Sequence, residues 1–127
     1  MSSLAPSPAA YRQGAVMAAT PAELIVMLYD GARRFLRQAG LAMQESEVER
    51  AHNSLRRAEL IIAHLDGVLD YEQGEVAQNL HSIYRFCLAH LNSARLQQDA
   101  GKLDEISELL GELREAWAQA ADEVARA

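Results

Sequence analysis

The sequence is poor in the residues that build disulfide-bonded, sheet-rich or membrane-spanning proteins. Its single cysteine, Cys87, excludes an internal disulfide and suits a reducing cytoplasm. Aromatic residues make up only 6% of the chain and β-branched residues are sparse, which argues against a sheet protein. The longest apolar run, from Leu24 to Tyr29, is too short to span a bilayer, and no secretory signal is visible. These absences favour a helical protein without stable membrane insertion.

The chain also lacks an excess of positive charge. It has 12 basic and 18 acidic residues, a formal net charge of -6 and a sequence pI of about 5.1. A nucleic-acid-binding protein needs a basic stripe to neutralise phosphates, so we expect no nucleic acid partner. The local pairs Arg33-Arg34 and Arg56-Arg57 are interpreted as solvated helix faces.

What the chain does contain is a strong signal for helices. Its three prolines lie no later than Pro21, and a helix start is marked by Thr20, Pro21 and Glu23 as cap, first-turn proline and capping acid. We predict helices over 21–44, 47–69, 75–99 and 103–125, after a flexible tail at 1–19 that is rich in Ser, Ala, Pro and Gly. Apolar residues step by three and four along the second and fourth segments. They are Val48, Ala51, Leu55, Ala58, Ile62, Leu65 and Leu69, then Leu103, Ile106, Leu110, Leu113, Trp117, Ala120 and Val124.

Short connections determine how these helices are arranged. The one between the third and fourth helices has Gly101 where a left-handed C-terminal cap is expected. Because short loops force consecutive helices to lie antiparallel, the predicted fold is an all-α, up-down-up-down four-helix bundle. Residues 20–127 form this one domain, and the N-terminal tail is a flexible cap segment.

A di-iron enzyme is the first catalytic interpretation of such a bundle. It requires two Glu-x-x-His pairs on different helices. Glu49 and His52 supply one pair, but Gln78 stands where a second pair ending at His81 would need a carboxylate. The match is therefore interpreted as chance, and no metal site is predicted.

Two other chemical interpretations are also weak. In a phosphotransfer domain, lysine follows the reactive histidine, whereas His64 has Asp66 beside that position, where it would repel phosphate. Cys87 lies on the apolar stripe of the third helix, as a buried structural cysteine does. We therefore predict no catalytic residues, no cofactor and no enzyme activity.

Apolar residues beyond the main stripes leave two interpretations open. They form either a broad core or an exposed groove that holds a partner helix. They are Ile25, Leu36, Leu60, Ile61, Val68, Ala77 and Leu109. In the tail, Tyr11, Val16 and Met17 are either disordered or folded back over such a groove.

Several motifs resemble the FliS family of flagellin export chaperones. They are an N-terminal Tyr11, the Thr20-Pro21 helix start, Leu28-Tyr29-Asp30-Gly31, Ala58-Glu59-Leu60-Ile61-Ile62, Gly74-Glu75-Val76-Ala77-Gln78-Asn79-Leu80 and Leu113-Arg114-Glu115-Ala116-Trp117. The resemblance covers about residues 11 to 117, and the order and spacing of the motifs carry it.

The resemblance implies a cytoplasmic chaperone that binds the C-terminal segment of flagellin, prevents premature polymerisation and assists delivery to the export apparatus. The flagellar export gate is a further candidate partner. We expect flagellin along exposed apolar positions of the second and third helices, and the N-terminal cap to compete with it. The expected flagellin-binding residues are Ile61, Leu65, Val68, Ala77, Leu80 and Tyr84, and those of the cap are Tyr11, Val16 and Met17. A metal-binding bundle enzyme and a helical signalling adaptor remain the alternatives.

Overall fold

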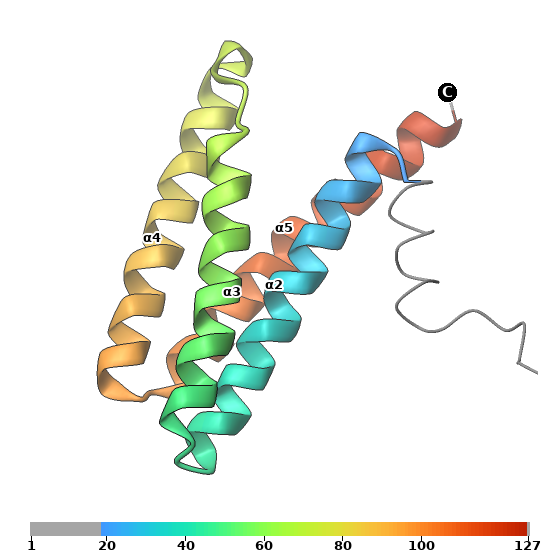
Figure 1. Cartoon of the computed structure of the whole chain (residues 1–127). Coiled ribbons are helices and arrows are strands. Elements are labelled where there is room, and N and C mark those ends of the chain that lie inside the picture. The colour runs from blue at the N-terminus through green and yellow to red at the C-terminus, as the bar shows by residue number, and fades with distance from the viewer. Residues whose placement is uncertain (1–18, 127) are drawn as a thin grey trace, which may run out of the picture.

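The computed structural model describes residues 19–126, with four long helices and one short 3-10 helix (Figure 1). The predicted tail, with Tyr11, Val16 and Met17, lies almost wholly outside the described residues. The elements are α2 (Pro21–Gln44), α3 (Val48–Gly67), η1 (Tyr71–Gln73), α4 (Glu75–Gln97) and α5 (Ala100–Arg126). No strand occurs among them, and the all-α prediction is confirmed.

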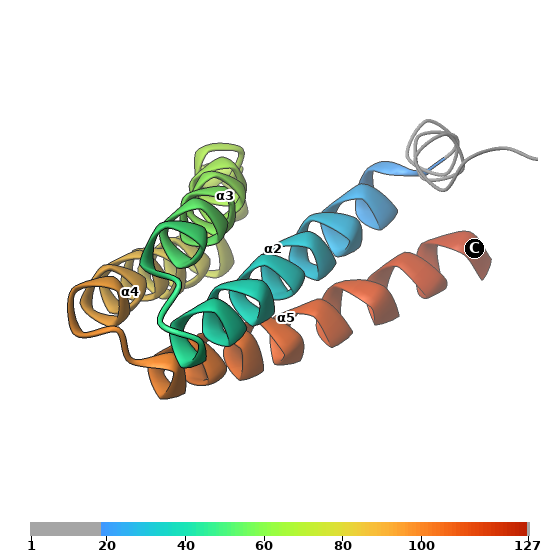
Figure 2. The same ribbon diagram turned by 60° about the horizontal axis from the view of Figure 1, so that its bottom comes forward.

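Consecutive helices run antiparallel, which confirms the up-down-up-down bundle (Figure 1). Helix α2 packs against α3 and α5, and α4 packs against the same two helices. The pair α2/α5 and the pair α3/α4 approach each other where short connections join α2 to α3 and α4 to α5. At the opposite end the two pairs diverge (Figures 1 and 2). We call these the closed end and the open end of the bundle.

The predicted start of α2 is confirmed in detail. The Thr20 hydroxyl accepts a hydrogen bond from the Glu23 N–H at 3.2 Å and donates one to the Glu23 carboxylate at 3.1 Å. Pro21 occupies the first turn of the helix. Backbone N–H groups have no acceptor within the helix there, so proline forfeits no hydrogen bond. These local interactions set the N-terminus of α2.

The predicted role of Gly101 as a left-handed cap is wrong. Gln98 takes the left-handed conformation instead, with φ of 51°. Asp99 then accepts a hydrogen bond on its side chain from the Gly101 N–H at 3.0 Å, so that α5 begins at Ala100. The chain therefore completes its turn from α4 into α5 before Gly101, which lies in the first turn of α5.

The core consists of the central parts of the predicted apolar stripes. In α3 it includes Ala51, Leu55, Ala58, Ile62 and Leu65, and in α5 it includes Leu103, Ile106 and Leu110. The prediction that the stripes are buried to their ends is wrong, since Val48 and Val124 are exposed. Val48 lies in the first turn of α3 and Val124 in the last turn of α5, where the bundle ends. The interpretation of Cys87 as buried is confirmed, and burial raises the pKa of its thiol to about 11.

The acid and glycine within the first helix serve packing between helices. The Asp30 carboxylate accepts a hydrogen bond from Arg114 Nε of α5 at 2.9 Å. Gly31 is buried against α3, where an added Cβ would lie 3.4 Å from Ile61 Cδ1. A residue much larger than alanine would therefore push α2 away from α3.

Candidate functional site

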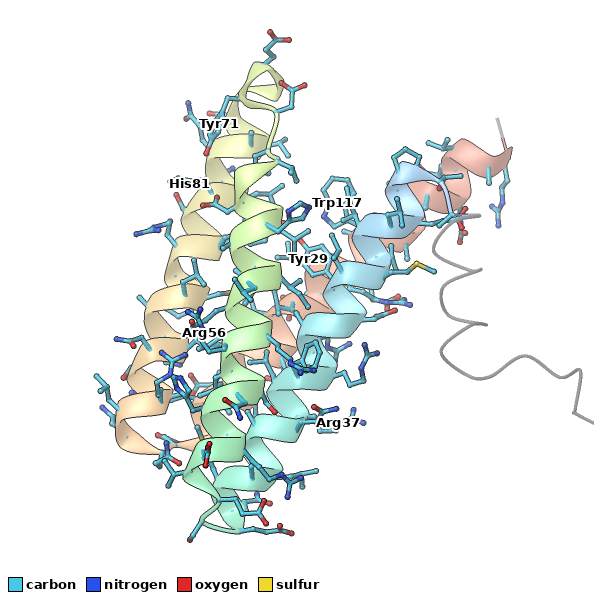
Figure 3. All side chains as sticks on the ribbon, viewed as in Figure 1. Tyr29, Arg37, Arg56, Tyr71, His81 and Trp117 are labelled. Atoms are coloured by element: carbon cyan, nitrogen blue, oxygen red, sulfur yellow. The ribbon has the colours of Figure 1, made fainter. Side chains whose placement is uncertain are left out.

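A small apolar groove lies at the open end of the bundle. Its cavity measures about 190 Å³, and residues from all four long helices line it. The lining residues are Ile25 of α2, Leu65 of α3, Val68, Leu69 and Asp70 after α3, Val76, Ala77, Leu80 and Tyr84 of α4, and Trp117 of α5. Figure 3 shows Trp117 and Tyr29 in the space between the diverging helix pairs. We call this site the apolar groove.

Tyr84, a buried residue of the groove lining, is paired with the buried Tyr29 of α2. The hydroxyls of Tyr29 and Tyr84 form a hydrogen bond with each other, joining α2 to α4 across the bundle. Burial is the main cause that raises the pKa of both phenols, so both remain neutral at physiological pH. The groove therefore has an uncharged floor, with the tyrosine hydroxyls directed at each other.

The rim of the apolar groove carries apolar side chains that face water. Val68 is 57% exposed and Val76 is 63% exposed, whereas Leu80, which also lines the groove, is half-buried. Exposed apolar side chains are ordinary when they are scattered, but these converge on one cavity. A partner with an apolar face would remove both valines from water.

The wall between α3 and α4 is held by a polar contact beside the apolar groove. His81 Nδ1 of α4 lies 2.7 Å from Asp66 Oδ1 of α3, and Tyr71 of η1 meets the His81 ring edge-on at 6.1 Å. This contact joins the ends of α3 and α4 beside the groove.

The structure brings together five of the six residues predicted to bind a partner. Leu65, Val68, Ala77, Leu80 and Tyr84 all line the apolar groove. The sixth, Ile61, is not among the lining residues.

The expectation that these positions are exposed is wrong for three of them. Leu65, Ala77 and Tyr84 are buried, because they point inward where α3 and α4 face the other pair. Ile61 is half-buried and packs against the core near Gly31. These four side chains belong to the interior of the bundle. Among the predicted residues, only Val68 is well exposed.

The sequence interpretation missed contributions from the first and last helices. The sequence pattern places Ile25 among the off-stripe apolar residues and Trp117 on the stripe of the last helix, and predicts a binding role for neither. Both line the groove, together with Val76. The one available signal was Trp117, the only tryptophan, placed on the apolar stripe near the end of a helix.

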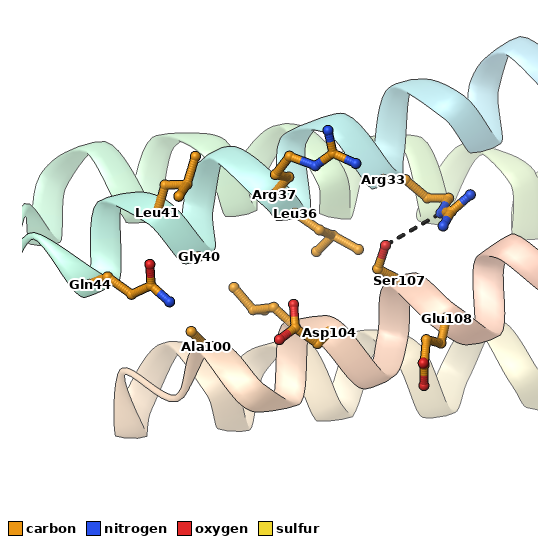
Figure 4. A pocket seen from close by; sticks show the side chains of 11 residues that line it. Arg33, Leu36, Arg37, Gly40, Leu41, Gln44, Ala100, Asp104, Ser107 and Glu108 are labelled. Carbon is orange, nitrogen blue, oxygen red and sulfur yellow. Dashed lines mark hydrogen bonds between the residues drawn. The ribbon is translucent and has the colours of Figure 1, made fainter.

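A larger hollow of about 450 Å³ lies between α2 and α5, nearer the closed end (Figure 4). Arg33 and Arg37 line it on α2, and Asp104, Ser107 and Glu108 line it on α5. Arg33 Nε donates a hydrogen bond to Ser107 Oγ at 3.3 Å. Because this hollow presents charges of both signs, it is less suited than the apolar groove to cover an apolar partner.

The histidines and acids considered for enzyme chemistry do not converge. Across residues 19–126, no three side chains of His, Cys, Asp or Glu are grouped to hold a metal ion. Glu49, His52 and His64 are exposed, and His81 is held by Asp66. None of the helices described here has the length and hydropathy needed to cross a membrane.

Comparison with known proteins identifies relatives over most of the chain. The family model described as "Flagellar protein FliS" matches residues 4–124. A protein of Bacillus subtilis named flagellar secretion chaperone FliS is 34% identical over 111 residues, covering 87% of this chain and 83% of the relative. The protein of the same name from Salmonella typhimurium is 38% identical, over 84% of this chain and 81% of its own. FliSB of Pseudomonas aeruginosa, also named a flagellar secretion chaperone, is 36% identical, over 78% of this chain and 79% of its own.

Proposed function

Because the chain belongs to the FliS family of flagellar secretion chaperones, we propose that it binds the C-terminal segment of flagellin in the cytoplasm. Proteins of this family are chaperones and not enzymes, so the chain acts by binding. The bound segment is kept from polymerising before export and is delivered to the flagellar export apparatus. The export gate is a second proposed partner.

The observation that supports this proposal is the apolar groove, with exposed Val68 and Val76 at its rim. Unassembled filament segments with exposed apolar faces tend to associate with one another. A groove between helices accepts one face of an amphipathic helix, with side chains at spacings of three and four as anchors. Burying a valine or leucine contributes about 1.5–3 kcal/mol, so a few anchors offset the cost of ordering the segment.

Co-expression with flagellin tests the proposal directly. We expect a stable soluble complex with full-length flagellin, and no complex with flagellin that lacks its C-terminal segment. Flagellin that lacks its N-terminal segment is the matched control and is expected to remain bound. Isolation by size-exclusion chromatography gives the measurement. If deletion of the C-terminal segment leaves the complex intact, the proposed client segment is wrong.

We also propose that the N-terminal tail covers the apolar groove until flagellin displaces it. Tyr11, Val16 and Met17 belong to this tail, which leads into α2 only a few residues before the groove residue Ile25. An intramolecular competitor lowers the apparent affinity for the client by the fraction of molecules that it occupies.

Deleting residues 1–17 is therefore expected to tighten binding of a flagellin C-terminal peptide about 3- to 10-fold, or to promote oligomers of the free protein. Tyr11→Ala is expected to have the same effect more weakly. Calorimetry and light scattering provide the two measurements. Unchanged affinity and unchanged oligomeric state in both variants would show that the tail has a different role.

A further inference from the structure

Half of the basic residues of this acidic protein lie in two short stretches of α2 and α3. Six of the 12 basic residues fall within residues 31–44 and 50–58, and neither stretch contains an Asp or a Glu. These six are Arg33, Arg34, Arg37, Arg50, Arg56 and Arg57. The two stretches lie on α2 and α3, which pack side by side as antiparallel neighbours (Figure 1). Of these six, Arg33 and Arg37 line the hollow between α2 and α5, and Arg50 and Arg57 line a separate hollow between α2 and α3.

The hollow between α2 and α3 measures about 280 Å³. Its lining residues are Gln38, Leu41, Arg50, Asn53, Ser54 and Arg57. We call the hollow, together with the adjacent Arg34, the arginine groove. It contains no residue of the apolar groove, which lies at the open end.

Two arginines of this groove are held by an aromatic ring and not by an acidic side chain. The guanidinium carbons of Arg34 and Arg57 lie 5.7 and 5.6 Å from the centroid of the Phe35 ring. Among residues 19–126, neither Arg34 nor Arg57 forms an ion pair, and both are exposed. Stacking on an aromatic ring reduces the freedom of the side chain and leaves the N–H donors available to a ligand.

The neighbouring groups complete a surface that fits carboxylates on a polypeptide. Gln38, Asn53 and Ser54 offer amide and hydroxyl groups, and Leu41, which is exposed, offers an apolar contact. Guanidinium groups bind carboxylates through two parallel hydrogen bonds. We propose that the arginine groove docks an acidic segment of a partner protein while the apolar groove is free to hold the client.

The overall charge favours a short acidic segment over a larger polyanion. Nucleic acid or an anionic bilayer extends well beyond one groove and meets the negative charge of the rest of the protein. A short segment interacts mainly within a Debye length of about 8–10 Å. It would meet Arg34 and Arg57, whereas Arg50 in the same groove is paired with Glu47. Two separate docking surfaces would let one chaperone contact its client and a further protein at the same time.

The test uses the full-length protein and a fluorescent peptide of about 14 residues, in which Glu recurs at helical spacing among Ala and Leu. We expect fluorescence anisotropy to show binding that weakens as salt rises from about 50 to about 200 mM. Combined Arg34→Glu and Arg57→Glu substitutions should weaken it at least about 10-fold. Lysine at both positions should weaken it about 3-fold, because lysine keeps the charge and loses the bidentate geometry.

Arg85→Glu is the matched control, since Arg85 is an exposed arginine on α4 away from this groove. It should leave peptide binding within about 2-fold of the unmodified protein. Circular dichroism and binding of a flagellin C-terminal peptide should be unchanged in every variant, which separates this proposal from the proposed chaperone function.

The proposal is overturned if the unmodified protein does not bind the acidic peptide, or if Arg85→Glu weakens binding as much as the double reversal. Tighter binding of an RNA oligonucleotide or of phosphatidylglycerol vesicles through Arg34 and Arg57, or self-association through them, would also overturn it.

Discussion

Replacing Val68 and Val76 together by aspartate is expected to weaken binding of the flagellin C-terminal segment by about 100-fold, or about 3 kcal/mol. Both valines stand at the rim of the apolar groove and are 57% and 63% exposed in the free protein. The new carboxylates would therefore remain hydrated until an apolar helix docks over them. Docking would then remove unpaired charges from water, which is costly. Isothermal titration calorimetry measures the loss, and circular dichroism verifies the fold.

Val124→Asp provides the matched control for this double substitution. Val124 is 69% exposed near the end of α5 and does not line the groove, so its replacement should leave affinity unchanged. Ala77→Asp would be less informative, because Ala77 is buried and a charge there would disturb the free bundle as well. Equal affinity of the rim variant and the control would place the client elsewhere on the chaperone.

The fold was predictable to the extent that it rests on local chemistry. The start of α2 is predictable from Thr20, Pro21 and Glu23, because a helix cap involves only neighbouring residues. The start of α5 was misplaced because Gln98, a residue without a strong turn preference, takes the left-handed conformation. The exposure of Val48 and Val124 depends on where neighbouring helices end, which no single stripe reveals.

The apolar groove was only partly predictable, because it depends on how the helix pairs diverge. Periodicity selects the faces of α3 and α4 that meet the core, and so Leu65, Ala77 and Tyr84 were named. Periodicity does not show at which position along α3 and α4 the other two helices cease to pack against these faces. Ile25 and Trp117 reach the same cavity only because the open ends of α2 and α5 face it across the bundle (Figure 3).

Replacing Ile106 by alanine is expected to lower the free energy of unfolding by about 2–4 kcal/mol. Ile106 is fully buried in α5, toward the closed end, and the shorter side chain would leave a cavity that the surrounding helices fill only partly. Leu96→Ala is the matched control. Leu96 is 78% exposed, so its replacement should change the stability by less than about 0.5 kcal/mol. Urea denaturation followed by circular dichroism measures both values.

The same pair of variants tests whether the apolar groove is formed before the client arrives. Ile106 does not line the groove, so the folded Ile106→Ala protein should bind a flagellin C-terminal peptide with unchanged affinity. Peptide at about 100 times its dissociation constant should then restore about 2.7 kcal/mol of stability in this variant, in Leu96→Ala and in the unmodified protein alike. If Ile106→Ala binds the peptide more tightly than Leu96→Ala does, loosening the core must help the client to enter. The client would then require an opened bundle, and the groove seen between the diverging helix pairs would be only its point of entry.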